Sequence, residues 1–304
     1  MSTNPHPAWK APWFFWTLLA VSCWGVWAVL SKLLGDALSA ELSQALSTLG
    51  ALPVMGALLL SKRLKQHPGR RNRGLAWALG AGVLTCLGNT AYYGMLRSGA
   101  KAATVVPLTA MYPLVTLLLA VGLLGERLNR VQQAGILLSL GAIYLFNVPD
   151  ETGLVSSALT FALVPIGLWG LAGLLQKIST NEVTGELSAL MFLAAFIPIG
   201  AYLVWQHPLP ANGLSTRNWI LILLVGFCFA LGNFALLEAF ARGGKASVIA
   251  PLAGLYPMVS VPIAVLALGE KVGTRELAGI LLALLSVVAL SLESPPSASK
   301  LPNH

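Results

Sequence analysis

Charged residues are scarce in this sequence, and their scarcity excludes an ordinary soluble domain. Only 10% of the 304 residues are Asp, Glu, Lys or Arg, against about 25% in soluble proteins. Hydrophobic residues make up 56%, and the mean hydropathy is +0.76. Too little polar surface remains to enclose a water-soluble core, so we expect lipid to solvate much of the chain.

Residue types that bind metals or catalyse reactions are also scarce. The three cysteines, Cys23, Cys86 and Cys228, lie inside apolar segments without the spacing of a disulfide or metal site. The four histidines lie in tails or polar loops, and the long apolar runs contain neither His nor Asp. A membrane-embedded enzyme would need a constellation such as a His-Glu-x-x-His helix. We therefore predict a protein without enzyme activity, cofactor or metal.

The sequence does contain ten apolar runs of a length that crosses a bilayer, which is about 20 residues. They cover residues 13–34, 40–60, 74–96, 102–123, 129–147, 154–177, 186–206, 217–240, 246–268 and 273–292. Most connections are short and leave no room for a soluble domain. We predict an all-α integral membrane protein with ten transmembrane helices, a cytoplasmic N-terminal tail over 1–12 and a disordered cytoplasmic tail over 293–304.

The net charge of +8 reports topology rather than nucleic-acid binding, because the basic residues cluster between the apolar runs. With both termini on one side of the membrane, 13 Lys and Arg residues fall on that side and 6 on the other. The stretch 62–73 supplies most of this asymmetry. The positive-inside rule then places both termini in the cytoplasm, with the chain in the cell (inner) membrane.

The sequence also repeats itself. Residues 88–140 and the stretch 144 positions later are identical at 22 of 53 positions. The identities include Asn, Lys, Tyr, Pro and Glu, which apolar composition alone would not align. The first helices match at a shift of 145, as in Trp24 and Trp169. The chain therefore divides into two five-helix repeats, 13–148 and 153–292.

The odd number of helices in each repeat has a topological consequence. The second repeat must enter the membrane upside down relative to the first, so Glu126 should face the cytoplasm and its match Glu270 the outside. Inverted repeats around a central cavity are typical of secondary transporters, whose halves exchange conformations around one site. A purely structural duplication is the alternative.

At these positions the sequence resembles a known family. The segments Val-Val-Pro-Leu-Thr-Ala-Met-Tyr-Pro (105–113), Leu-Gly-Glu-Arg-Leu (124–128) and Gln-Gln-Ala-Gly-Ile-Leu-Leu (132–138) are similar to one EamA-type repeat. Ile-Ala-Pro-Leu-Ala-Gly-Leu-Tyr-Pro (249–257) begins a second. Two such repeats resemble the drug/metabolite transporter superfamily. The resemblance implies a ten-helix basket with a central cavity, and uptake or export of amino acids, nucleosides, sugars or similar solutes.

Two asparagines lie at matching positions deep in the third and eighth runs. A side-chain amide in hydrocarbon needs a partner, so Asn89 and Asn233 must face protein or water rather than lipid. They either bond neighbouring helices or contact substrate as a pseudo-symmetric pair. A polar stripe on the second run, which includes Gln44, either lines the cavity or bonds to backbone carbonyls.

Prolines and tyrosines recur together in the fourth and ninth runs. Each proline removes a backbone donor and frees a carbonyl group, and in lipid such a group must be buried or hydrated. We predict kinks or hinges here, with Tyr112 and Tyr256 either pointing into the cavity or packing between helices. The predicted hinge residues are Pro107, Pro113, Pro251 and Pro257.

Glu238 is the one acidic residue well inside an apolar run, and its match in the first repeat is Gly94. It lies four residues before Arg242, which allows an ion pair on one helix. The alternative is a cavity carboxylate that binds a cationic group or a coupling proton. The matched Trp24 and Trp169 suit either a shared packing role or aromatic contacts with substrate.

The leading hypothesis is a secondary transporter that exports a small polar metabolite by alternating access, as a monomer or homodimer in the bilayer. It rests on the inverted duplication, the paired polar residues and the clustered prolines. A receptor or scaffold without transport is the second hypothesis, and the lack of docking loops weighs against it. A membrane-embedded enzyme is the third.

Overall fold

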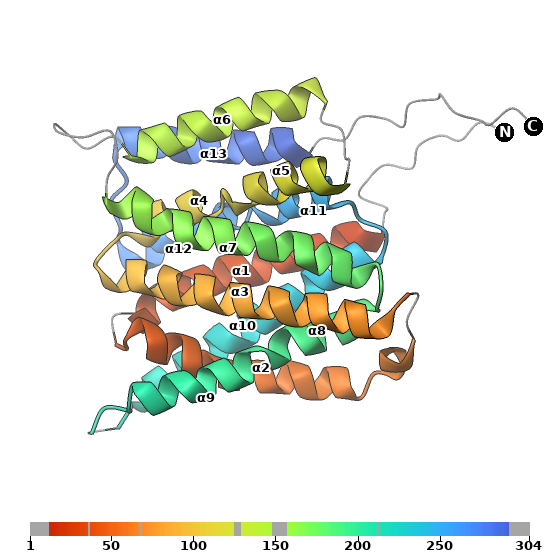
Figure 1. Ribbon diagram of the computed structural model, residues 1–304. Coiled ribbons are helices and arrows are strands. Elements are labelled where there is room, and N and C mark those ends of the chain that lie inside the picture. Colours follow the sequence, from red (N-terminus) through yellow and green to blue (C-terminus); the bar gives the residue numbers. More distant parts are fainter. Residues whose placement is uncertain are drawn as a thin grey trace, which may run out of the picture.

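The computed structural model describes residues 12–35, 37–66, 69–124, 129–147, 157–211 and 213–291. Over these residues the chain is helical, with no strand, and its long helices run side by side in one bundle (Figure 1). Glu126 and almost all of the two predicted tails lie outside the described residues.

The two halves of the chain contain the same series of helices. In the first half these are α1 (Pro12–Gly35), α2 (Ala40–Leu59), η2 (Lys62–Lys65), α3 (Arg71–Arg97), α4 (Ala102–Thr109), α5 (Tyr112–Leu124) and α6 (Arg130–Asn147). In the second they are α7 (Ser157–Thr180), α8 (Gly185–Ala194), α9 (Phe196–Gln206), α10 (Thr216–Ala241), α11 (Ala246–Ala253), α12 (Pro257–Leu268) and α13 (Thr274–Ser291).

Matched sequence positions start matched helices in the same way. The hydroxyl of Ser39 accepts the backbone N–H of Leu42 at 3.2 Å and caps α2. Thr184, 145 positions later, caps α8 by accepting the N–H of Leu187 at 3.3 Å. A hydroxyl at this position satisfies one of the free donors of the first helical turn. The duplicated sequence therefore specifies duplicated helix ends.

The packing of the helices follows the repeat as well. α3 packs along α7 and α1 along α10, and each pair becomes the other when the halves are exchanged. Gly25 of α1 lies against Val259 of α12, and the matched Gly170 of α7 lies against Val115 of α5. A Cβ at either glycine would overlap the valine, so both close approaches need glycine. The halves thus interlock through equivalent contacts.

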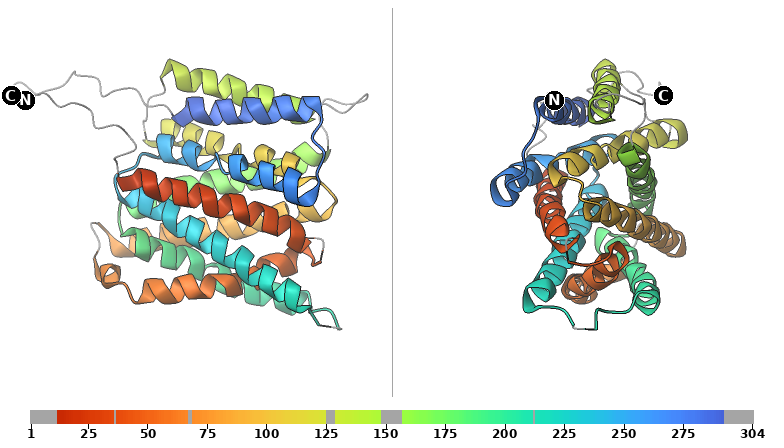
Figure 2. Two further views of the ribbon diagram at one scale, coloured as in Figure 1. Left: turned by 180° about the vertical axis from the view of Figure 1, so that it is seen from behind. Right: turned by 90° about the vertical axis from the view of Figure 1, so that its left-hand side faces the viewer.

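The helices α6 and α13 lie at the edge of the bundle, beside the helices that join the two halves. They pack on each other along their length, and Figures 1 and 2 show the pair at one edge of the bundle. They correspond to the predicted fifth and tenth spans.

The fourth and ninth runs are each broken in the middle. α4 ends at Thr109 before α5 begins, and α11 ends at Ala253 before α12 begins. Each break comes just before a predicted hinge residue, Pro113 or Pro257. The other two hinge prolines, Pro107 and Pro251, instead lie inside α4 and α11. A further break, at Ala195 between α8 and α9, was not predicted.

Eight helical segments within the described residues are long and apolar enough to cross a membrane. The protein is therefore an all-α, multi-pass membrane protein. The apolar stretches of α6 and α13 are shorter, Gln133–Ala142 and Leu277–Ser286. The count of ten transmembrane helices stays a prediction.

Loops that the sequence analysis assigns to one side of the membrane lie at one end of the bundle. At the end assigned to the cytoplasm, the N–H of Gly69 donates to the carbonyl of Glu182 at 3.0 Å. At the opposite end, Nζ of Lys101 donates to the carbonyl of Lys271 at 3.0 Å. Each contact joins the first half to the second.

Candidate substrate pocket

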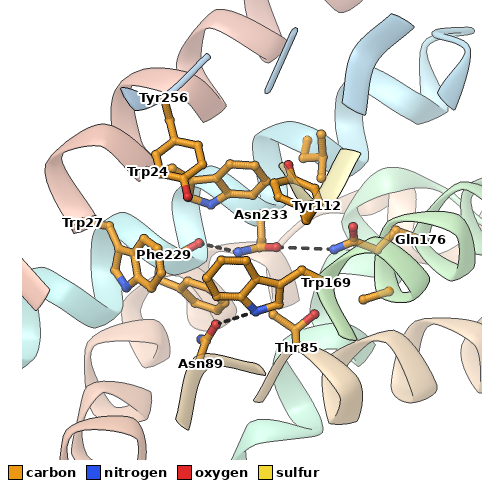
Figure 3. A pocket seen from close by; sticks show the side chains of 12 residues that line it. Trp24, Trp27, Thr85, Asn89, Tyr112, Trp169, Gln176, Phe229, Asn233 and Tyr256 are labelled. Atoms are coloured by element: carbon orange, nitrogen blue, oxygen red, sulfur yellow. Dashed lines mark hydrogen bonds between the residues drawn. The ribbon is translucent and has the colours of Figure 1, made fainter. Parts of the chain in front are cut away.

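A pocket lies in the middle of the bundle, where the two halves meet (Figure 3). It is lined from α1, α3, α5, α7 and α10, and from the residue before α12. The lining residues are Trp24, Trp27, Thr85, Asn89, Tyr112, Trp169, Ala172, Gln176, Phe229, Asn233, Leu236 and Tyr256.

Half of this lining consists of three identical pairs from matched positions of the repeat. The pairs are Trp24 with Trp169, Asn89 with Asn233, and Tyr112 with Tyr256. All six are among the eight residues that the sequence indicates as cavity candidates. The structure brings them together because the halves meet through equivalent contacts, so matched residues face each other.

One tryptophan–asparagine hydrogen bond joins the two halves across the pocket. Nε1 of Trp169 donates to Oδ1 of Asn89 at 3.1 Å. The indole lies directly over Gly88, where a Cβ would come within 2.6 Å of Nε1. Glycine before the asparagine therefore lets the ring approach its acceptor.

The equivalent hydrogen bond, between Trp24 and Asn233, does not form. Trp24 lies over Gly232 in the same way, but its Nε1 has no hydrogen-bond partner among the described residues. Oδ1 of Asn233 instead accepts Nε2 of Gln176 at 3.3 Å, while Nδ2 of Asn233 donates to the carbonyl of Phe229 at 2.9 Å. Because that carbonyl can only accept, it fixes the orientation of the amide.

The two tyrosines differ in the same manner. The hydroxyl of Tyr256 lies 3.4 Å from the carbonyl of Val106 and 3.5 Å from Oγ1 of Thr109. The hydroxyl of Tyr112 has no partner among the described residues. The position that matches Thr109 is Ala253, which carries no hydroxyl. In the tryptophan and tyrosine pairs one member is thus bonded and the other is not, whereas both asparagines are bonded.

Sequence reasoning missed six lining residues, although a signal for them exists. Each lies three or four positions from another lining residue on its helix, and that spacing places both on one helix face. Trp27 follows Trp24 by three, for example, and Phe229 precedes Asn233 by four. The missed residues are Trp27, Thr85, Ala172, Gln176, Phe229 and Leu236.

The remaining two candidates lie elsewhere. Gln44 is buried on α2 and is not part of the pocket lining; its Oε1 has no partner within the described part of the chain. Glu238 is buried in an ion-pair cluster at the end assigned to the cytoplasm. Its Oε2 lies 2.9 Å from Nε of Arg242, four residues on, and 3.4 Å from Nη1 of Arg63.

The ion-pair cluster has a second carboxylate. Nη1 of Arg63, in η2, also lies 2.9 Å from Oε1 of Glu186, the second residue of α8. At the opposite end Glu270 has a different role. Its two carboxylate oxygens accept the N–H groups of Ala102 and Ala103 at 2.9 and 2.8 Å and cap α4. A carboxylate at a helix N-terminus satisfies free donors and favours the helix dipole.

The pocket itself is lined without an Asp, Glu, Lys or Arg. It offers aromatic faces, side-chain amides and hydroxyls. Such a combination suits reversible binding of a small solute more than bond-breaking chemistry, which needs a nucleophile or general base. In the described part of the chain, no three His, Cys, Asp or Glu residues lie close enough to hold a metal ion.

Comparison with known proteins places the chain in a family. The sequence pattern of the EamA-like transporter family matches twice, over residues 11–148 and 156–292. The chain belongs to the EamA-like transporter family. It is therefore a membrane transporter of the drug/metabolite transporter superfamily, as its two repeats predicted. The family is one of transporters rather than enzymes.

The fold also occurs among solved structures. One, titled "Crystal structure of protein", has 18% sequence identity and a TM-score of 0.66, over 90% of this chain and 94% of that one. At this identity the likeness shows a shared fold alone. No curated protein matches the sequence.

Proposed function

We propose that this EamA-like protein is a secondary transporter that carries a small polar metabolite across the cell (inner) membrane by alternating access. The observation that supports this most is the position of the pocket. It lies between the two halves and is framed by three identical residue pairs. A site on such an axis stays fixed while the halves exchange conformations and expose it to either side.

The contacts at the two ends fit this cycle. At one end Arg63 holds Glu186 and Glu238 of the other half. At the other, Glu270 caps α4 and Lys101 reaches the backbone of Lys271. Opening either end requires its cross-half contacts to separate, whereas the contacts within each half can stay intact.

The proposal includes a topology. Ten helices cross the membrane, with α6 and α13 as the fifth and tenth, and both termini are cytoplasmic. The charge asymmetry between the loops supports this orientation. Amino acids, nucleosides, sugars and related solutes are the substrate classes, and export is the direction.

The experiment has two stages. Metabolites inside and outside cells are compared between strains that lack or overproduce the protein. Any metabolite whose distribution changes is then loaded into proteoliposomes, and its flux is measured with and without the protein. Protein-dependent flux is expected. If no metabolite changes and no loaded solute moves, the transporter proposal fails in favour of a receptor or scaffold.

A further inference from the structure

The pocket lining departs from the internal repeat at four positions. At one of them Leu236 lines the pocket, whereas its match Tyr92 does not. Trp27 corresponds to Ala172, and Phe229 corresponds to Thr85; all four line the pocket. Gln176 corresponds to Ser31, which does not line it. The frame of the pocket is therefore symmetric, whereas the residues that fill it are not. If the region only joined two equivalent halves, the residues at matched lining positions would not have to differ.

The departures gather large rings at one side of the pocket. Trp27 and Phe229 have ring centroids 5.6 Å apart, and Trp27 also stacks on Tyr92 at 5.0 Å with an interplanar angle of 23°. Trp169 joins the same cluster at 6.1 Å from Trp27. In Figure 3, Trp27 and Phe229 lie on the opposite side of Asn233 from Gln176. We name Trp27, Phe229 and Trp169 the aromatic wall.

The lining also includes small and hydrogen-bonding residues, of which Gln176 lies across Asn233 from Trp27 and Phe229 (Figure 3), and we name Thr85, Ala172 and Gln176 the polar wall. Nε2 of Gln176 donates to Asn233. Its Oε1 bonds to no described residue and can accept a hydrogen bond from a solute. The hydroxyl of Thr85 donates to the carbonyl of Ala81 at 2.8 Å, which leaves its lone pairs to accept. Beside it, Asn89 uses its oxygen for Trp169 and keeps its Nδ2 hydrogens.

The pocket has no charged lining residue to receive a charged solute. A carboxylate that left water here would lose its hydration without gaining an ion partner, which is strongly unfavourable. A planar ring gains stacking on the aromatic wall. Uncharged hydroxyl or amide groups gain partners on the polar wall.

We propose that the pocket selects an uncharged amphipathic solute with a planar heteroaromatic ring at one end and hydroxyl groups at the other, and that nucleosides are its substrate class. The base stacks on the aromatic wall and the sugar hydroxyls meet Gln176 and Thr85. Trp27 and Gln176 are then specificity-determining residues. This inference rests on the proposed transport function and narrows its substrate.

The first test is equilibrium binding of radiolabelled solutes to the purified full-length protein. Uridine and adenosine are expected to bind at least about 10-fold more tightly than glucose, which lacks the ring. They should exceed tryptophan, which has a carboxylate, by at least the same factor. Tighter binding of tryptophan or glucose than of both nucleosides would overturn the proposal.

The second test uses the internal repeat to choose variants. Trp27→Ala introduces the residue found at the matched position 172, and should weaken uridine binding about 10-fold, as expected for the loss of one stacking partner. Trp205→Ala is the matched control, because Trp205 is 76% exposed and lies outside the pocket. Equal effects of the two variants would contradict a stacking role.

Gln176→Ser introduces the residue found at the matched position 31 and separates a binding role from a structural one. It should weaken uridine binding several-fold but leave uracil binding unchanged, because uracil has the ring without the sugar. Gln206→Ser, at the exposed end of α9, is the control. An equal loss for uridine and uracil would assign Gln176 a structural role and overturn this part of the proposal.

Thermal unfolding of each variant shows whether it is folded, and Phe229→Thr, which copies matched position 85, replaces Trp27→Ala if that variant does not fold. The outcomes also separate the two proposals. Protein-dependent flux of a charged metabolite without nucleoside binding overturns the nucleoside class and leaves the transporter standing. Absence of flux for every solute overturns the transport function itself.

Discussion

The guanidinium of Arg63 lies 2.9 Å from Oε1 of Glu186 and ties the first half of the chain to the second. Glu186 and the neighbouring Glu238 are 6% and 1% exposed, so two buried carboxylates depend on Arg63 and Arg242 for compensation. A buried charge without a partner is costly. This cluster is therefore a cross-half electrostatic contact at the end of the bundle assigned to the cytoplasm.

Removal of Arg63 should destabilise the protein. Arg63→Ala leaves two buried carboxylates with one arginine, and we expect a loss of about 1–3 kcal/mol, less than for a fully buried pair because the Arg63 side chain is 41% exposed. Thermal unfolding in detergent measures the change. The double variant Arg63→Ala/Glu186→Gln should recover part of it, and Lys65→Ala, on the same short helix, serves as the control. A double variant no more stable than the single would contradict the role of charge.

The two tryptophans of the pocket should differ in their response to the same substitution. Trp169→Phe removes the donor to Asn89 and leaves that amide oxygen unpaired, whereas Trp24→Phe removes an N–H without an acceptor. Trp169→Phe should therefore cost about 1 kcal/mol more in unfolding free energy. The lost ring area is the same in both, so each variant controls for the other. Equal destabilisation would show that the hydrogen bond adds no stability.

The closest approach of α2 and α10 should not tolerate a methyl group. A Cβ at Gly226 would collide with the backbone carbonyl of Ser47, which belongs to a helix and has little freedom to move. We expect Gly226→Ala to cost at least about 1–3 kcal/mol or to prevent folding. Gly122→Ala, where a Cβ meets no atom within 4 Å, should be neutral or slightly stabilising. Yield and unfolding temperature compare the two.

Matched loop residues should lie on opposite sides of the membrane. Lys101 and Lys245 occupy equivalent exposed positions, immediately before α4 and α11 respectively. In a variant without Cys23, Cys86 and Cys228, Lys101→Cys should react with a membrane-impermeant maleimide in intact cells. Lys245→Cys should react only after permeabilisation. Labelling of both from one side would rule out inverted repeats.

Much of the architecture was predictable because it depends on local composition and on identity between the halves. The length of the apolar runs predicted a multi-pass helical protein, and the matched Tyr-Pro pairs predicted the breaks before Pro113 and Pro257. The break at Ala195 comes three residues before Pro198, but the match of that proline, Pro53, lies inside the unbroken α2. Pro107 and Pro251 were predicted as hinges, and each lies inside a short helix, two residues before its last residue.

The sequence by itself determined that lipid solvates much of this chain and that its two halves are duplicated, and it marked Trp24, Asn89, Tyr112 and their matches as candidates for one cavity. These conclusions follow from composition, period and identity. Only the tertiary structure decided which of the matched groups are bonded. The direction of an amide depends on the donors and acceptors within about 3.5 Å of it, and these come from distant segments. Asn233 therefore bonds to Gln176 rather than Trp24, and Glu238 pairs with Arg63, 175 positions away.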